Sequence, residues 1–137
     1  MHIEIVTPIG VKYSGTARGV IVPGALGDMG ILPGHQPLLA ALRTGACTVD
    51  VEGHDQVVLL VDGGYVHVTE GQKVVITTEL CETAQDIDVE AARSALESAS
   101  AVLAQAREDV STATWTLKKR AVDLATTRIR VGSTKGG

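Results

Sequence analysis

The period of the hydrophobic pattern changes once along this chain, near residues 84 and 85, and this change limits the fold more than any other feature. Before it, apolar and polar residues alternate in short runs; after it, apolar residues recur every three or four positions. Alternation is typical of β-strands, and the longer period is typical of α-helices. The sequence therefore predicts a β domain over residues 1–85 and an α-helical domain over residues 86–137.

The first part of the chain contains short strand patterns that recur about every ten residues. Turn signals such as Pro23-Gly24 and Asp62-Gly63-Gly64 separate them. The run 56–61 is almost entirely apolar, which suits a strand buried on both faces. Short strands at this spacing predict an antiparallel β-sandwich. The expected strands cover residues 2–6, 16–22, 36–42, 47–52, 56–61, 65–69 and 73–78.

The second part carries two helical stripes. Asp88 can cap the first helix, which we expect to run to Val110. A break and a new cap at Ser111-Thr112 precede a second helix that starts near Trp115, and Gly132 can end it. Two helices joined by a few residues form an antiparallel hairpin. Its interface is rich in Ala, which buries little area per residue, so we expect the hairpin to be the less stable unit.

Charge and composition exclude several classes of protein. The net charge of −4 argues against a nucleic-acid-binding protein, and no apolar run approaches the length of a membrane-spanning helix. The amino terminus carries no secretory or transit pattern. Cys47 and Cys81 lie in apolar runs without zinc-ligand spacing, so we expect buried free thiols. These features predict a cytoplasmic protein of bacterial type.

The chain shows no pattern of catalytic residues. Its four histidines share no metal-ligand spacing, and it lacks a Gly-x-Ser-x-Gly motif and the Gly-Lys-Ser/Thr ending of a phosphate-binding loop. The acidic pairs Asp50 with Glu52 and Asp62 with Glu70 suit the solvent face of strands and their turns. We therefore expect a non-catalytic protein without a metal or a cofactor.

Residues 24–39 are distinctive because glycines and prolines alternate with apolar residues. Gly permits positive φ and Pro fixes φ, so the segment predicts successive turns around a very short strand at Ile31-Leu32. The apolar residues that can anchor it to a core are Met29, Ile31, Leu38 and Leu39. From composition alone, a structural corner between strands is the simplest interpretation.

The order Gly-x-x-Gly-Ile-Leu-Pro-Gly-His-x-Pro-Leu-Leu, over positions 27–39, resembles the epsilon subunit of the bacterial F-type ATP synthase. The predicted sandwich and hairpin are also similar to that family along nearly the whole chain. The resemblance implies a non-catalytic subunit of the rotating central stalk. Such a subunit binds the gamma subunit and the membrane c-ring, couples ion flow to ATP synthesis, and lies peripherally on the cytoplasmic face of the inner membrane.

The resemblance also implies roles for single residues. In the family the glycine-rich segment lies at the end of the sandwich that faces the membrane rotor ring. By this resemblance, Asp28, Gly30 and His35 are c-ring contact residues. We expect Asp28 and His35 to lie exposed at one end of the sandwich. His35 also fits a structural role as a hydrogen-bonded turn residue.

Basic residues are concentrated after Trp115, where Asp123 is the single acid. They are Lys118, Lys119, Arg120, Arg128 and Arg130, with Lys135 in the tail. They suit either a solvated face that pairs with the first helix or a docking surface for an acidic partner. The resemblance implies the second: the family's hairpin can extend beside gamma to the alpha/beta catalytic head and block ATP hydrolysis. The hairpin is then a movable brake.

Relatives whose hairpin binds ATP carry Ile-Asp-x-x-Arg-Ala at the start of the first helix. In the stretch 87–92 of this chain, Ala91 stands at the arginine position, and Leu124 replaces an arginine of the second helix. Asp88 and Arg128 are what remains of the nucleotide site, and Asp88 also fits a simple N-cap. We therefore expect weak or no ATP binding.

Two other classes of protein fit the residues. One is a free-standing β-sandwich protein-binding module with a helical interaction tail, and the other is a fused small-ligand-binding protein. A stalk subunit co-purifies with its partner chains in fixed stoichiometry, whereas a free module does not, so this measurement separates the alternatives.

Overall fold

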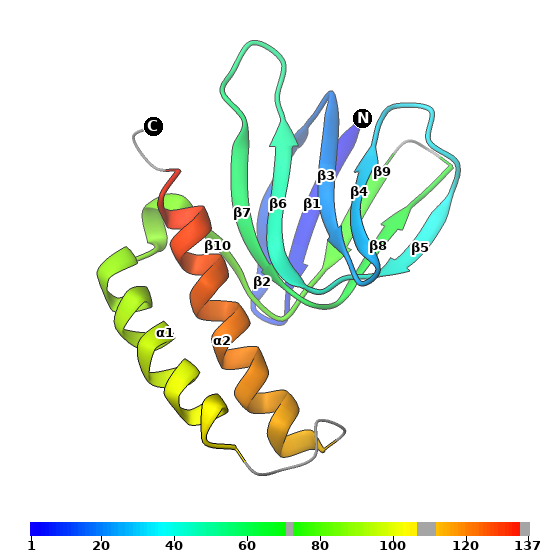
Figure 1. Ribbon diagram of the computed structural model, residues 1–137. Helices are drawn as coiled ribbons and strands as arrows, with labels where there is room; N and C mark the ends of the chain where they lie inside the picture. Colours follow the sequence, from blue (N-terminus) through cyan, green and yellow to red (C-terminus); the bar gives the residue numbers. More distant parts are fainter. Residues whose placement is uncertain (71–72, 107–111, 135–137) are drawn as a thin grey trace. The chain divides into compact units, whose positions relative to one another are not determined.

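The computed structural model describes residues 1–70, 73–106 and 112–134. Contacts divide the chain into two compact units, Met1–Glu82 and Thr83–Gly137. The first unit is a β-sandwich and the second contains two helices (Figure 1). The change of hydrophobic period therefore predicts the fold class correctly.

The sandwich consists of two five-stranded sheets, with strand orders β2-β1-β9-β8-β5 and β10-β7-β6-β3-β4. β1 pairs with β9 in parallel, while neighbours such as β1/β2, β3/β4 and β6/β7 are antiparallel. In chain order the strands are β1 (His2–Thr7), β2 (Gly10–Thr16), β3 (Gly19–Gly24), β4 (Gly27–Ile31), β5 (Leu38–Ala41), β6 (Thr44–Asp50), β7 (Val57–Asp62), β8 (Tyr65–Val68), β9 (Lys73–Thr77) and β10 (Cys81–Thr83).

The strand pattern misses or misplaces some elements. It does not predict β2, because most of that strand is exposed and Val11 and Tyr13 are its only large apolar residues. The expectation of a very short strand at Ile31-Leu32 is wrong: the glycine-rich run Gly27–Ile31 pairs with β3 along its whole length. Leu39, an expected core anchor, is exposed because it alternates along β5 with the half-buried Leu38.

Aliphatic side chains from both sheets fill the core. Ile3 and Ile5 of β1 are fully buried, as is Ile76 of the neighbouring β9. The chain has no Phe, so Val, Ile and Leu supply almost all of the buried apolar area. In β7, Leu59, Leu60 and Val61 have no exposed surface, which confirms the prediction of a strand buried on both faces.

Asp62 is buried, and the expectation that it faces solvent is wrong. Its relative exposure is 3%, because it ends a central strand of the second sheet. The Thr44 hydroxyl donates to Asp62 Oδ1 at 2.6 Å, and the Asp62 amide donates to Thr78 Oγ1 at 2.9 Å. Two threonines distant in sequence therefore satisfy this carboxylate and its backbone, as a buried polar group requires.

Both cysteines are buried thiols outside any disulfide, which confirms the prediction from their apolar surroundings. Burial raises the pKa of the Cys47 thiol to about 12, because the interior disfavours the thiolate; the neighbouring Cys81 adds to this effect. Cys47 therefore stays protonated at neutral pH and contributes to the core as a small apolar group.

The helical unit consists of a short 3-10 turn at Ala84–Asp86, helix α1 at Val89–Ala104 and helix α2 at Ala113–Gly132. Asp88 Oδ1 accepts the Ala91 amide at 3.0 Å, and Thr112 Oγ1 accepts the Trp115 amide at 3.2 Å. Both predicted helix caps are therefore confirmed. α1 ends at Ala104, before the expected end at Val110, and residues 107–111 lie outside the described residues.

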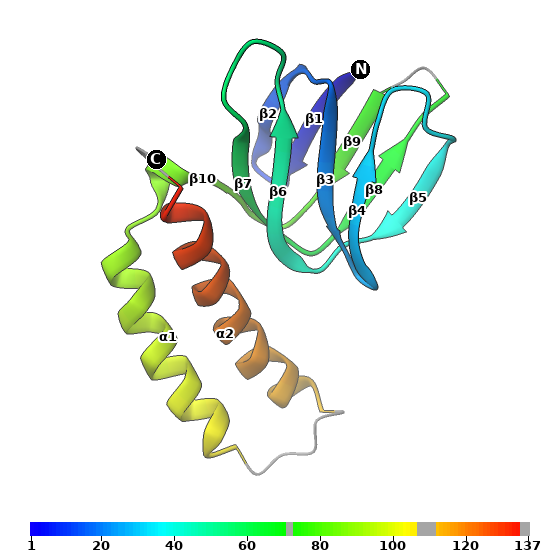
Figure 2. The ribbon, with the colours of Figure 1, turned by 45° about the horizontal axis from the view of Figure 1, so that its top comes forward.

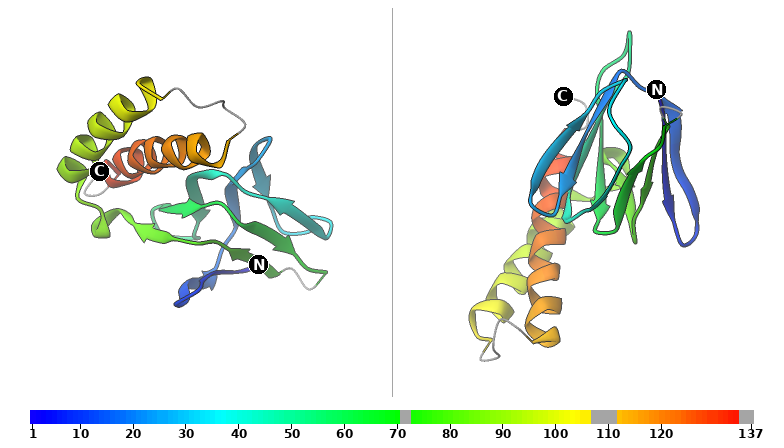
Figure 3. Two further views of the ribbon diagram at one scale, coloured as in Figure 1. Left: turned by 90° about the horizontal axis from the view of Figure 1, so that it is seen from below. Right: turned by 90° about the vertical axis from the view of Figure 1, so that its right-hand side faces the viewer.

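The two helices run antiparallel and side by side (Figures 1 and 2). Their junction is tightest where α2 ends: a Cβ on Gly132 would lie 2.6 Å from Val89 Cγ2 and 2.9 Å from Ile87 Cγ2. At the other end, Val102 and Leu117 are 52% and 64% exposed. The hairpin is therefore closely packed at its base, whereas apolar side chains near its other end are exposed. Figure 3 shows the course of the two helices from two further sides.

We propose that residues 1–85 fold without the hairpin, because the apolar core of the sandwich is made within its own strands. The isolated fragment should show dispersed amide signals in NMR spectra and a cooperative thermal transition. The full chain is the control. A collapsed fragment that melts without cooperativity would show that the sandwich needs the helices.

We also predict that Gly132→Ala weakens the base of the hairpin by about 1–3 kcal/mol, as overpacking does elsewhere. Ala is favoured over Gly by about 1 kcal/mol inside a helix, but Gly132 is the last residue of α2, so the clash should dominate. Amide hydrogen exchange across α1 and α2 measures the effect. Gly15→Ala is the matched control, since its nearest Cβ contact is an ordinary 3.7 Å. Unchanged exchange in the helices would contradict the prediction.

Candidate functional site

The turn between β3 and β4 presents an apolar side chain to solvent. Gly24 pairs with Gly27, so Ala25 and Leu26 form the turn, and Gly27 has a φ of +140° that favours glycine. Leu26 is fully exposed. The Ala25 amide donates to the Ala41 carbonyl at 2.9 Å, which ties the turn to the end of β5.

Asp28 lies two residues after Leu26, and its side chain is half exposed. Arg43, which follows β5, donates from Nη2 to Asp28 Oδ1 at 2.6 Å and from Nη1 to the Gly24 carbonyl at 2.9 Å. The Arg43 amide also donates to the Pro23 carbonyl at 2.9 Å. One arginine thus joins both strands of the β3–β4 hairpin to the connection between the sheets.

Beside this turn the surface is hollowed, with a volume of about 340 Å³. The hollow is lined by Ala25, Leu26, Gly27, Asp28, Met29, Ala40 and Ala41. The sequence analysis misses Leu26 and Arg43. An apolar residue at the centre of a turn is a signal that could have found Leu26. The residues next to Arg43 in the sequence give no sign of its role, because its partner Asp28 lies 15 residues earlier and is brought close only by the fold.

His35 occupies a separate turn. Its amide donates to the Leu32 carbonyl at 3.0 Å across Pro33-Gly34, and Gly34 has the positive φ, +89°, that a type II turn requires. His35 Nδ1 lies 2.7 Å from the Gln36 carbonyl oxygen, in keeping with a hydrogen-bonded turn residue.

Asp28 and His35 do not lie at one end of the sandwich, and that expectation is wrong. Asp28 belongs to the turn before β4, and His35 follows the opposite end of the same strand (Figure 1). From Asp28 to Ile31 alone the strand spans about 10 Å. Gly30 lies between them, exposed and paired with Ile21. The physical reason is that Gly27–Ile31 forms an extended strand instead of a compact loop.

Two exposed apolar side chains lie on the outer face of the first sheet, where β5 and β8 pair, while the same face carries the Glu4–Lys73 ion pair elsewhere. Ile3 and Ile5 point into the core, so their alternate neighbours in the paired strands point outwards. On this face Leu39 is opposite His67, and Ala41 is opposite Tyr65. Leu39 and Tyr65 are 68% and 56% exposed. Clustered exposed apolar side chains of this kind mark protein-binding surfaces.

The five predicted basic residues do not form one face of α2. Successive residues turn by about 100° around a helix, so Lys118, Lys119 and Arg120 point in three directions. Arg130 shares a side with Lys119, from which it is separated by about three turns. Lys119 Nζ lies 2.5 Å from Asp123 Oδ1 on the same helix. Any single partner can therefore meet only some of these charges at once.

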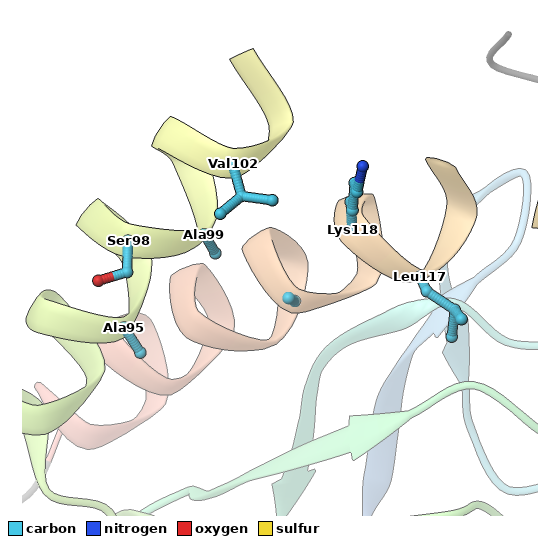
Figure 4. Close-up of a pocket in the computed structure, with 7 residues that line it drawn as sticks. Ala95, Ser98, Ala99, Val102, Leu117 and Lys118 are labelled. Atoms are coloured by element: carbon cyan, nitrogen blue, oxygen red, sulfur yellow. The ribbon is translucent and has the colours of Figure 1, made fainter. Parts of the chain in front are cut away.

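The helices enclose an open apolar groove of about 500 Å³. It is lined by Ala95, Ser98, Ala99 and Val102 of α1 and by Leu117, Lys118 and Ala121 of α2. Figure 4 shows Val102 on α1 and Leu117 and Lys118 on α2 at the same end of this groove. The small side chains Ala95, Ala99 and Ala121 leave the groove open.

The residues of the residual nucleotide site lie at the base of the hairpin. The Asp88 carboxylate caps α1 by accepting the Ala91 amide. Arg128 lies one turn before Gly132, which packs against Val89 at the start of α1. Arg93 pairs with Glu90 at 2.7 Å on the surface of α1. Ala91 offers no charged group to a phosphate, so weak or absent ATP binding stays our prediction.

Within residues 1–70, 73–106 and 112–134, no group of three or more His, Cys, Asp or Glu side chains could hold a metal ion. In the same residues no helix is long and apolar enough to cross a membrane.

Residues 1–84 match a known family of domains, described as the β-sandwich domain of the ATP synthase delta/epsilon chain. Among curated proteins, the ATP synthase epsilon chain 2 of Ralstonia nicotianae is 39% identical over 110 residues, 80% of this chain and 78% of that protein. The epsilon chain of Nitratidesulfovibrio vulgaris is 37% identical over 131 residues, 96% of this chain and 94% of that protein.

Solved structures show the same fold. A chain in the Euglena gracilis mitochondrial ATP synthase, in a structure that contains OSCP, F1 and the c-ring, superposes with a TM-score of 0.79 at 23% identity. The match covers 91% of this chain and 76% of that one. The family match and the curated relatives show that the chain belongs to the ATP synthase epsilon chain family, whose members are non-catalytic subunits of that enzyme.

Proposed function

We propose that this chain is a rotor subunit of the central stalk, which links the gamma subunit to the membrane c-ring and couples ion flow to ATP synthesis. The observation that carries the proposal is the β3–β4 turn, which holds Leu26 and Asp28 outwards on a hydrogen-bonded frame. The subunit then lies peripherally on the cytoplasmic face of a bacterial inner membrane. The similar Euglena chain comes from a structure that contains F1 and the c-ring, which supports a place for this chain in the central stalk.

The geometry narrows the proposed ring contact. If the β3–β4 turn faces the c-ring, Asp28 and Leu26 meet it directly and Gly30 lies at its border. His35 then lies beyond the far end of β4, so we assign it to a different surface from that of Asp28.

We assign the gamma subunit to the outer face of the first sheet, around Leu39 and Tyr65. These two side chains are large, apolar and exposed, as the centre of a stable protein interface requires. The face runs along the strands, whereas the β3–β4 turn lies at their end, so both partners can bind at once. A free-standing module has less support, because the relatives that cover most of this chain are epsilon chains.

Crosslinking tests the ring contact. In the assembled ATP synthase, Leu26→Cys should crosslink to the polar loop of the c-ring, because position 26 is fully exposed at the tip of the turn. The control is His54→Cys, an exposed position in the connection between β6 and β7 at the opposite end of the strands (Figure 1). Crosslinks to the ring from position 54 and none from position 26 would reverse the proposed orientation. Absence of the chain from purified enzyme would favour a free-standing module.

We propose in addition that the hairpin is a movable brake on ATP hydrolysis. Val102 and Leu117 already face solvent, so this end of the hairpin can leave one binding partner for another at a small cost in free energy. The basic residues of α2 then meet acidic residues of the alpha/beta catalytic head. Exposed ion pairs are worth about 0–1 kcal/mol each, so the brake needs several of them together, with apolar contacts in the groove.

Hydrolysis by the assembled enzyme tests the brake. Truncation after residue 86 should raise the rate several-fold. Combined replacement of Lys118, Lys119, Arg120, Arg128 and Arg130 by Ala should raise it less, because these side chains point in different directions around α2. Replacement of the sandwich residues Lys12 and Arg18 by Ala controls for net charge. If neither hairpin change raises hydrolysis while assembly stays normal, the hairpin is structural.

A further inference from the structure

Arg43 makes three hydrogen bonds to the β3–β4 hairpin. Its guanidinium donates to Asp28 Oδ1 at 2.6 Å and to the Gly24 carbonyl at 2.9 Å, and its amide donates to the Pro23 carbonyl at 2.9 Å. Asp28 stands on β4 and Gly24 on β3, so one rigid fork spans the two strands next to the turn. No other kind of side chain offers two parallel donors in this way.

The Arg43 guanidinium fixes the orientation of the β3–β4 turn more than it stabilises the folded protein. The side chains of Arg43 and Asp28 are 43% and 50% exposed, so water screens their attraction and the pair should add little to the free energy of unfolding. The turn it holds is only two residues long and carries the fully exposed Leu26. With both strands of the hairpin fixed, Leu26 and Asp28 keep one orientation toward a partner, and less entropy is lost on binding.

The pair also changes the charge that the turn presents. With Arg43 Nη2 at 2.6 Å, the Asp28 carboxylate is neutralised within the protein. A partner therefore meets an apolar tip beside an ion pair that can both donate and accept hydrogen bonds. This surface fits a polar loop with its own donors and acceptors better than it fits a strongly basic surface.

We propose that Arg43 is the positioning residue of the ring contact: it holds Asp28 and the Gly24 carbonyl so that the β3–β4 turn is presented to the c-ring in one fixed form. Asp28 acts in this contact through its pairing with Arg43 and not as an isolated anion. The inference rests on the proposed function for the identity of the partner, and on the hydrogen bonds alone for the clamp.

The isolated full-length protein tests the clamp without any partner. Arg43→Ala should speed hydrogen exchange of the Ala25 amide, which donates to Ala41 at the base of the turn, about five-fold or more. The thermal midpoint should hardly change. Arg43→Lys should restore part of the protection, because an ammonium group can reach one of the two acceptors. Arg18→Ala is the matched control: it removes an exposed ion pair, Arg18–Asp50 at 3.0 Å, away from this turn. Equal exchange in Arg43→Ala and the parent would overturn the clamp.

The assembled enzyme tests the positioning role through the crosslink from Leu26→Cys to the c-ring. In that background Arg43→Ala and Asp28→Ala should each lower the yield several-fold, and Arg18→Ala should leave it unchanged. The exchanged pair, Asp28→Arg with Arg43→Asp, should recover most of the loss seen with Arg43→Asp alone. Full yield in Arg43→Ala would refute the positioning role.

The outcomes separate the two proposals. If the parent Leu26→Cys enzyme gives no crosslink to the ring, the proposed function fails, while hydrogen exchange still decides whether Arg43 clamps the turn. If the exchanged pair restores protection of Ala25 but not the crosslink, Asp28 contacts the ring as an anion, and the proposal that it acts through its pairing is wrong.

Discussion

The aliphatic core between the two sheets is the constraint on which the sandwich depends. No phenylalanine is available, so closely packed Val, Ile and Leu side chains must hold ten strands in register. β1 lies inside its sheet, parallel to β9, and its fully buried Ile3 and Ile5 join the amino terminus to strands 70 residues later. A core of this kind fixes the ends of the strands, so the short turns that join them, such as Ala25-Leu26, are also held in place.

The two helices are held together by fewer large apolar side chains than the sandwich. Alanine lines much of the groove between α1 and α2, so little apolar area is buried there. Contact is tight where Gly132 lets α2 reach Val89 and Ile87. Towards the other end, Val102 and Leu117 remain exposed. In the proposed brake, the closely packed base would act as the anchor, and the exposed apolar residues farther along the helices would exchange one partner for another at small cost.

Sequence patterns predict those features that depend on residues close together in the chain. Strand alternation, the helix caps at Asp88 and Thr112 and the burial of both cysteines follow from neighbouring residues. β4 is missed because glycines carry no side-chain alternation, although its backbone pairs fully with β3. The burial of Asp62 and the reach of Arg43 depend on residues brought close only by the fold. For the same reason, Asp28 and His35 are near in sequence but separate in the molecule.

Two of the proposed contact surfaces, the β3–β4 turn and α2, should differ in how they respond to salt. At the β3–β4 turn the Asp28 carboxylate is already paired within the protein, and Leu26 supplies apolar contact, so screening removes little from that interface. On α2 the charges are spread around the helix, and attraction to an acidic partner is a sum of weak, exposed terms that salt reduces together. A rotor subunit with this division keeps its attachment to the ring constant while its hairpin responds to ionic conditions. The different salt responses expected for ring binding and for the hairpin follow from whether the charges at each surface are already paired within the protein, not from the number of charges.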